Sequence, residues 1–161
     1  MERDPDSPKS RLDDLRSRFH ARAAGCWRVS PDRSALEQVA FSAHELMTAE
    51  VSEGFASATR LVPFHAAELG IVNAATSGQV TVSRLAEISP DSGSGLWLRR
   101  FEATRSVAVP LIDDSGLIGV VSIALSDPDP DDQEVARAIR EAVTTWRVEW
   151  VSGLEALRPR Q

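Results

Sequence analysis

The strongest hydrophobic pattern of the chain lies between residues 105 and 126, where two apolar runs flank a short polar stretch. Val, Ile and Leu dominate residues 106–112 and 117–125, and such side chains suit a pleated, mostly buried surface. The DDSG stretch at 113–116 combines a glycine that can adopt a positive φ with aspartates that stabilise a turn. This pattern predicts a β-hairpin at the centre of a sheet.

Apolar side chains at three- and four-residue spacing predict a helix near each end of the chain. The first runs from Ser10, whose hydroxyl can cap it, to a stop at Gly25. The last runs from about residue 131 to 157 and would be about 40 Å long, more than a small sheet can cover. Its far end would therefore need a partner. Its apolar stripe consists of Val135, Ile139, Ala142, Trp146, Trp150, Leu154 and Leu157.

Shorter patterns fill the middle of the chain. Residues 48–62, 68–76 and 96–103 favour helices, with Pro63 ending the first and Gly78 capping the second. Residues 26–29 and 80–82 favour short strands. The apolar residues of 34–47 fit neither the helical period of about 3.6 nor the strand period of 2, so their local pattern leaves helix and strand both open.

Composition limits the class of protein. The 161 residues predict one domain over 10–157, with tails at 1–9 and 158–161. The net charge of -6 argues against nucleic acid as a main partner. The single cysteine fits a reducing, cytoplasmic location. No apolar run approaches the length of a membrane-spanning helix, so no membrane partner is expected.

The order of these motifs resembles that of GAF domains. The segment RSVAVPLIDDSGLIGVVSIAL resembles the family's final hairpin, and GFASATRLVPFHAAELGIVNAATSGQVTV resembles its central helix, loop, short helix and strand. CWRVS and LEQVAFS would then be the first two strands, which favours a strand over residues 35–42. The resemblance covers residue 25 to about residue 146.

The resemblance implies an α+β fold with an antiparallel sheet of five or six strands. Helices containing the termini would lie on one face, and short helices and loops would cover a pocket on the other. GAF domains are mostly regulatory, so it also implies a non-enzymatic sensory module that binds a small ligand or a signalling protein. Two alternatives stay open: a pure interaction module whose pocket is filled by its own side chains, and a haem- or redox-linked sensor using His65 or Cys26.

Seven side chains are expected to converge in the pocket, beneath residues 64–76 and 96–101. The alternative is that the aromatic rings only fill the core and that the histidine is a solvated loop residue. The expected ligand-binding residues are Phe41, His65, Trp97, Phe101, Arg105, Val107 and Ser122.

The terminal helices predict a homodimer through a four-helix interface. The alternative is that the apolar stripes of both helices only cover their own sheet. This alternative accounts for every part of the two stripes except residues 150–157. The expected interface residues are Leu12, Leu15, Phe19, Val143, Trp146, Trp150 and Leu154.

Other chemistry is disfavoured. The three histidines lie far apart without ligand spacing, so no metal site is expected. Cys26 is interpreted as a small buried hydrophobe, and the family's free methionine-sulfoxide reductases need a second cysteine that this chain lacks. The family's cyclic-nucleotide signature is absent, as are phosphate loops and the GxSxG and HExxH motifs. No enzyme activity is expected, and no cofactor or ligand can be named.

Overall fold

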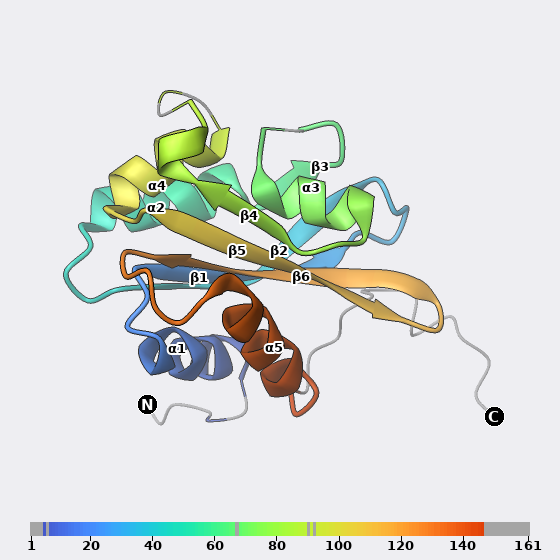
Figure 1. Ribbon diagram of the computed structural model, residues 1–161. Coiled ribbons are helices and arrows are strands. Elements are labelled where there is room, and N and C mark those ends of the chain that lie inside the picture. The colour runs from blue at the N-terminus through green and yellow to red at the C-terminus, as the bar shows by residue number, and fades with distance from the viewer. Residues whose placement is uncertain (1–4, 6, 67, 90, 92, 147–161) are drawn as a thin grey trace.

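The computed structural model describes residues 5, 7–66, 68–89, 91 and 93–146. These residues form three layers, with a six-stranded sheet between two groups of helices (Figure 1). The strand order is β3-β2-β1-β6-β5-β4, and every neighbouring pair is antiparallel. The predicted α+β architecture is therefore confirmed.

The strands at the centre of the sheet are the ones with the clearest sequence pattern. β5 (Arg105–Asp113) and β6 (Gly116–Leu125) form the predicted hairpin, and Gly116 has a φ of 108° at its turn. β6 also pairs with β1 (Ala23–Val29), which pairs with β2 (Ala35–Ala43). The strand predicted from the resemblance over residues 35–42 is confirmed.

Two predicted helices give way to strands where the sheet offers backbone partners. The first helix was expected to reach Gly25, but Ala23 already begins β1, which has a partner on both sides. The helix expected over 48–62 ends at Ala58, and β3 (Leu61–Pro63) follows as an edge strand. A proline suits an edge because it has no N–H to contribute to a further ladder. The other edge is β4 (Thr81–Arg84).

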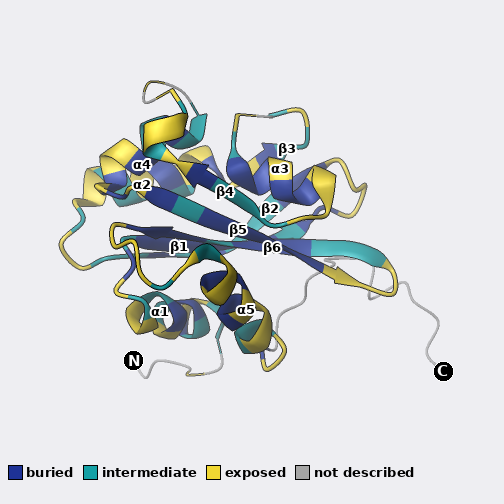
Figure 2. Cartoon of the chain, in the orientation of Figure 1, coloured by how far each residue is buried: buried dark blue, intermediate teal, exposed yellow. Residues whose placement is uncertain are grey.

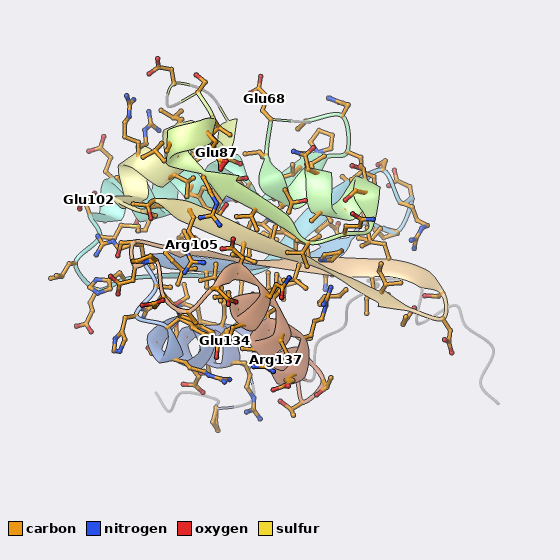
Figure 3. The ribbon with its side chains drawn as sticks, in the orientation of Figure 1. Glu68, Glu87, Glu102, Arg105, Glu134 and Arg137 are labelled. Atoms are coloured by element: carbon orange, nitrogen blue, oxygen red, sulfur yellow. The ribbon has the colours of Figure 1, made fainter. Side chains whose placement is uncertain are left out.

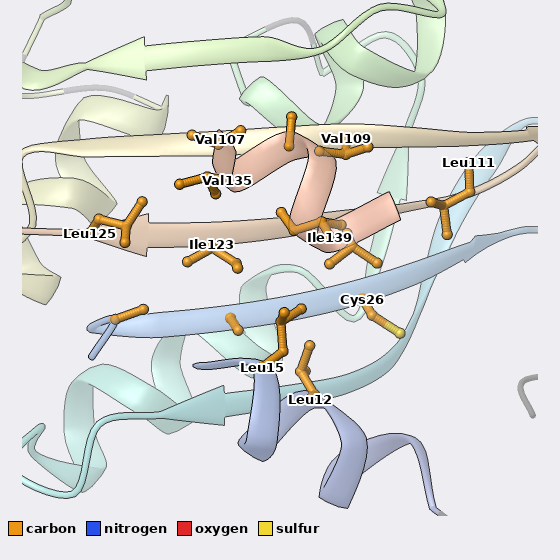
Figure 4. Close-up of a cluster of buried hydrophobic side chains, with 14 of the residues drawn as sticks. Leu12, Leu15, Cys26, Val107, Val109, Leu111, Ile123, Leu125, Val135 and Ile139 are labelled. Atoms are coloured by element: carbon orange, nitrogen blue, oxygen red, sulfur yellow. The ribbon is translucent and has the colours of Figure 1, made fainter. Parts of the chain in front are cut away.

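The terminal helices α1 (Pro8–Arg18) and α5 (Asp132–Val143) lie on one face of the sheet, as predicted (Figure 1). Their apolar stripes are buried against the strands, as the dark inner surfaces of the layers show (Figure 2). Figure 4 shows this cluster. Its fully buried members include Leu12, Cys26, Val107, Val109, Val121, Ile123, Val135 and Ile139.

The ends of both terminal helices differ from the prediction. α1 is capped by Ser7, whose Oγ accepts the N–H of Ser10 at 3.1 Å, so Ser10 lies inside the first turn. α5 begins after Asp131 but ends at Val143, and the helix predicted to continue to 157 is wrong at residues 144–146. The hydroxyls of Thr144 and Thr145 donate to helix carbonyls three residues earlier, which competes with helix continuation.

Three short helices cover the opposite face (Figure 1). They are α2 (Ala49–Ala58), α3 (Gly70–Ser77) and α4 (Gly93–Phe101), together with a 3-10 turn at Leu85–Glu87. α3 ends at Gly78 with a φ of 70°, the predicted glycine cap. The two helical layers thus lie on opposite sides of one sheet.

Candidate functional site

The register of three central strands builds the floor of a cavity from small side chains. Successive residues of a strand point to opposite faces, so the floor contains every second residue of β1, β6 and β5. Two rows of directly opposed residues cross these strands, and neither contains a side chain larger than serine. The rows are Ala23–Ala124–Ser106 and Gly25–Ser122–Ala108.

Aromatic rings stand over this floor. Phe55 of α2 is at their centre, with ring centroids 5.1 Å from Trp97, 5.0 Å from Phe101 and 5.0 Å from Phe41. Trp97 and Phe101 come from α4, one helical turn apart, and Phe41 comes from β2. The roof is therefore an interlocked aromatic cluster rather than a set of independent side chains.

Trp27 closes one side of the cavity because Gly25 leaves space for its ring. A Cβ placed on Gly25 would lie 2.3 Å from a ring carbon of Trp27, so the indole lies against a bare backbone. The indole N–H donates to the carbonyl of Thr59 at 2.8 Å, which fixes the ring. The Trp27 ring therefore covers the floor at Gly25.

The rim joins the first turns of α3 and α4. The N–H of Gly70 donates to Ser94 Oγ at 2.9 Å, and the N–H of Ser94 donates to the Glu68 carbonyl at 3.1 Å. Glu68 itself projects from the side of the short helices (Figure 3). Gly70, Ile71 and Ser94 line the cavity, so it lies beside the N-terminus of α3, whose first N–H is bound to Ser94 Oγ.

The cavity has a volume of about 50 Å³. Its lining is apolar except for Ser94, Ser106 and Ser122, and it contains no charged side chain among the described residues. None of these three hydroxyls has a protein acceptor within the described part of the chain. A water occupies about 10–15 Å³ on this measure, so the cavity suits a few waters or one very small ligand with acceptor atoms.

Four of the seven predicted ligand-binding residues line the cavity: Phe41, Trp97, Phe101 and Ser122. His65 lies in an exposed turn and is not part of the lining. The placement of Arg105 and Val107 at the pocket is wrong, because both face the terminal helices.

The strand register explains this error. Ser106 and Ala108, the neighbours of the misplaced residues, are the ones that face the cavity. Reading β5 one residue out of phase exchanges its two faces. The prediction also missed Trp27, Phe55 and Ser94, which come from parts of the chain brought together only by folding.

Arg105 instead fixes the segment that leads into α5. It is 3% exposed, and its guanidinium donates to the Pro130 carbonyl at 2.6 Å and to the Asp127 carbonyl at 3.0 Å. It also pairs with Asp132 at the start of α5. Arg84 lies directly opposite Arg105 across β4 and β5 and pairs with the same carboxylate. Asp132 therefore offsets the repulsion of two adjacent cations.

The residues predicted for a dimer interface lie mostly inside the chain's own core. Leu12 and Leu15 are 0% and 3% exposed, and Trp146 is 9% exposed. Phe19 and Val143 are half-buried at the edge of the same cluster. Trp150 and Leu154 lie outside the described residues. The alternative that these stripes cover their own sheet is confirmed for Leu12, Leu15 and Trp146, and dimerisation stays a prediction.

Cys26 lies on the face away from the cavity. Burial raises the pKa of its thiol to about 12, which keeps it protonated and unreactive at neutral pH. Its interpretation as a small buried hydrophobe is confirmed. Among the described residues, no group of three His, Cys, Asp or Glu side chains could hold a metal ion, and no helix there is long and apolar enough to cross a membrane.

Comparisons with known proteins agree with this architecture. The GAF domain model matches residues 9–144. No curated protein sequence matches the chain. Among solved structures, the GAF domain of a two-component sensor histidine kinase from Bacillus halodurans is 12% identical, with a TM-score of 0.61 over 94% of this chain and 98% of that one.

Two further solved structures share the fold. Free methionine-R-sulfoxide reductase from Neisseria meningitidis, in complex with its substrate, is 19% identical, with a TM-score of 0.57 over 83% of this chain and 71% of that one. NreA from Staphylococcus aureus, mutated in its nitrate binding site, is 16% identical, with a TM-score of 0.51 over 74% and 83%. At these identities the likeness establishes the fold alone.

Proposed function

The chain belongs to the GAF domain family, and from that premise we propose that it is a sensory or regulatory module whose cavity reversibly binds one small polar ligand. The observation that carries the proposal is the cavity itself, with a floor of small residues and three serine hydroxyls that lack a protein acceptor. Donors left unpaired in a half-buried site favour an acceptor-rich ligand over an apolar one.

The ligand class we propose is a small, weakly hydrated oxyanion such as nitrate. The volume of about 50 Å³ excludes a nucleotide or a tetrapyrrole without rearrangement. The first turn of α3 supplies the positive end of a helix dipole, and hydroxyls and backbone N–H groups can bind an anion without a cationic side chain. NreA, which shares the fold, has a nitrate binding site, so an oxyanion site is compatible with this architecture.

The test is a titration of the full chain with sodium nitrate, nitrite and formate, followed by thermal unfolding and calorimetry, with sodium chloride at equal ionic strength as the control. A ligand at a hundred times its Kd stabilises the folded state by about 2.7 kcal/mol, which raises Tm by several degrees. Ser106→Ala and Ser122→Ala should weaken the effect. Ser126→Ala, an exposed serine outside the cavity, should leave it unchanged. An equal rise in Tm with sodium chloride would reject the proposal that the ligand is an oxyanion.

A second candidate is an interaction module that binds no small molecule. It is supported by the aromatic cluster, which leaves a volume far below the roughly 300–1,000 Å³ typical of ligand sites. A metabolite panel that produces no thermal shift, together with a protein partner whose binding depends on exposed residues, would favour this function.

Signalling through a helical homodimer remains part of the proposal. Of the predicted interface, Phe19 and Val143 are the described residues with exposed apolar surface. Phe19→Glu should lower the mass in solution if the terminal helices pair across a two-fold axis. Leu46→Glu, which changes a 79% exposed leucine on a different part of the molecule, is the matched control.

We also propose that the module performs no catalysis and holds no haem. Cys26 lies on the opposite face with a raised pKa, and His65 is outside the cavity lining. A visible absorption band in the purified protein, or reduction of free methionine sulfoxide, would overturn this part of the proposal. A cytoplasmic location likewise stays a prediction.

A further inference from the structure

The C-terminal end of α4 is tied to both terminal helices. α4 supplies Trp97, Leu98 and Phe101 to the cavity, so a change in the cavity acts directly on this helix. The chain then passes through a tight turn, with Glu102 at a φ of 59°, directly into β5. Figure 3 shows Glu102 and Arg105 at this end of the sheet, on the way from the short-helix layer to the terminal-helix layer.

Arg22 forms the connection to α1. It lies in the segment between α1 and β1, and its Nε donates to the Phe101 carbonyl at 2.8 Å. Its side chain is 15% exposed, and Nη2 reaches Glu102 at 3.5 Å. The backbone N–H of Arg22 is held by the Ala124 carbonyl at 2.8 Å. The last carbonyl of the roof helix is thereby joined to the chain that leaves α1.

Arg105 forms the connection to α5. Four residues after Phe101, its guanidinium holds the Asp127 and Pro130 carbonyls and the Asp132 carboxylate, which together position the first turn of α5. Thr104 adds to this connection, since its hydroxyl donates at 3.3 Å to the carbonyl of Ser126, which follows β6 on the way to α5. Charge-assisted bonds of a buried guanidinium are the strong and directional kind.

We infer that the C-terminal end of α4 is a two-branched relay, in which Arg22 passes a displacement of the cavity roof to α1 and the Arg105–Asp132 pair passes it to α5. Both are positioning residues that touch no ligand. The inference rests on the proposed sensory function for its biological role, but its mechanical coupling is tested without any ligand. The alternative route is through the packed sheet, which would couple the roof to both helices together.

The test uses hydrogen exchange measured by mass spectrometry on peptides covering α1 and α5 of the full chain. Trp97→Leu loosens the roof without a ligand, and Trp97→Phe is the milder variant should the first fail to fold. We expect exchange in both helices to rise by about two- to thirtyfold, the range of coupling seen for mutations remote from a site. No change in either helix would overturn the relay.

Two further variants separate the branches. Arg22→Met removes the bond to Phe101, so Trp97→Leu should then affect α5 alone. Arg105→Met removes the bonds to the Asp127 and Pro130 carbonyls and to Asp132, so the same change should then affect α1 alone. Arg33→Met is the matched control, because Arg33 also donates to a backbone carbonyl, at 2.9 Å on Leu117, but does so at the turn end of the β5–β6 hairpin rather than at the start of β5. Equal effects on both helices in every background would assign the coupling to the sheet and overturn the relay.

Sodium nitrate distinguishes this inference from the proposed function. If nitrate changes exchange in both helices and each branch variant removes one response, both proposals stand. If nitrate changes nothing while the Trp97 variants behave as expected, the oxyanion is wrong and the relay stands. If nitrate raises Tm and the branch variants leave the helix responses intact, the relay is wrong and the ligand stands.

Discussion

The two faces of the central sheet share the same backbone but differ in side-chain volume. On the terminal-helix face, the rows crossing β1, β6 and β5 contain branched aliphatic residues and are fully buried under α1 and α5. On the cavity face, the rows one residue away contain glycine, alanine and serine. The rows on the terminal-helix face are Ala24–Ile123–Val107 and Cys26–Val121–Val109.

This difference indicates that one face of the sheet stabilises the fold while the other forms the cavity. The filled face supplies the hydrophobic stabilisation that holds the strands in register, since close-packed interiors lose free energy when atoms are removed. The opposite face can then leave its floor bare and use aromatic rings from α2 and α4 as a roof. Substitutions that add or remove volume on each face test this division directly.

Removing volume from the filled face should have the largest effect. Ile123 is 0% exposed, and Ile123→Ala should lower the free energy of unfolding by about 2–5 kcal/mol through lost burial and a residual cavity. Ile112→Ala, at a position on β5 that is 57% exposed, should change it by less than about 0.5 kcal/mol. Urea unfolding monitored by circular dichroism measures both. Similar losses for the two variants would show that the terminal-helix face is loosely packed.

Adding volume should have a smaller effect that depends on the face. Ala24→Val places two methyl groups among fully buried neighbours and should cost about 1–3 kcal/mol. Ala124→Val adds the same groups beside the cavity and should cost less than about 1 kcal/mol, because open space accepts them. It should also reduce the thermal shift with nitrate. Equal costs at the two positions would contradict the proposed difference in space.

The parts of the fold that the sequence predicted are those determined by local signals. The hairpin follows from two apolar runs and a DDSG turn, and the end of α3 follows from Gly78. The end of α5 and the existence of β3 were missed because they depend on competition from threonine hydroxyls and on a partner strand supplied by β2. Such tertiary effects leave little trace in a local pattern.

The residues of the candidate site were likewise predicted only where a local pattern identified them. Trp97 and Phe101 were predicted because they lie one helical turn apart on a short amphipathic helix. Arg105 was misplaced because face assignment requires the register, and a shift of one residue exchanges the faces of a strand. Gly25 matters because the Trp27 ring packs against its bare backbone. The spacing of residues in the sequence does not predict this contact.

The thiol of Cys26 provides a third test, which probes whether the filled face excludes water. An exposed thiol has a pKa near 9.0, whereas burial raises the pKa of Cys26 to about 12. Between these values the unfolded chain loses a proton that the folded chain retains, so stability is full below pH 9 and falls as pH rises. The expected loss is about 1.4 kcal/mol per pH unit relative to Cys26→Ala.

Urea unfolding of both proteins at pH 8.5 and pH 10 measures this difference, because titrations elsewhere in the chain cancel between the two. The Cys26 protein should lose more stability over this interval than the alanine variant. The same pH dependence in both would mean that water reaches the thiol in the folded state.

The smallest effect is expected for serines on the cavity face. The hydroxyls of Ser106 and Ser122 have no protein acceptor within the described residues, so Ser106→Ala and Ser122→Ala should each change the unfolding free energy by less than about 0.5 kcal/mol. Ser42 is the contrasting serine on the filled face. It is 0% exposed, donates to Asp13 and accepts from Arg16 Nε at 2.8 Å, so Ser42→Ala should cost about 1–3 kcal/mol. Urea unfolding without added anion compares the three variants. A loss at Ser122 as large as that at Ser42 would show that its hydroxyl serves the fold, and the argument for a ligand acceptor at that position would fail.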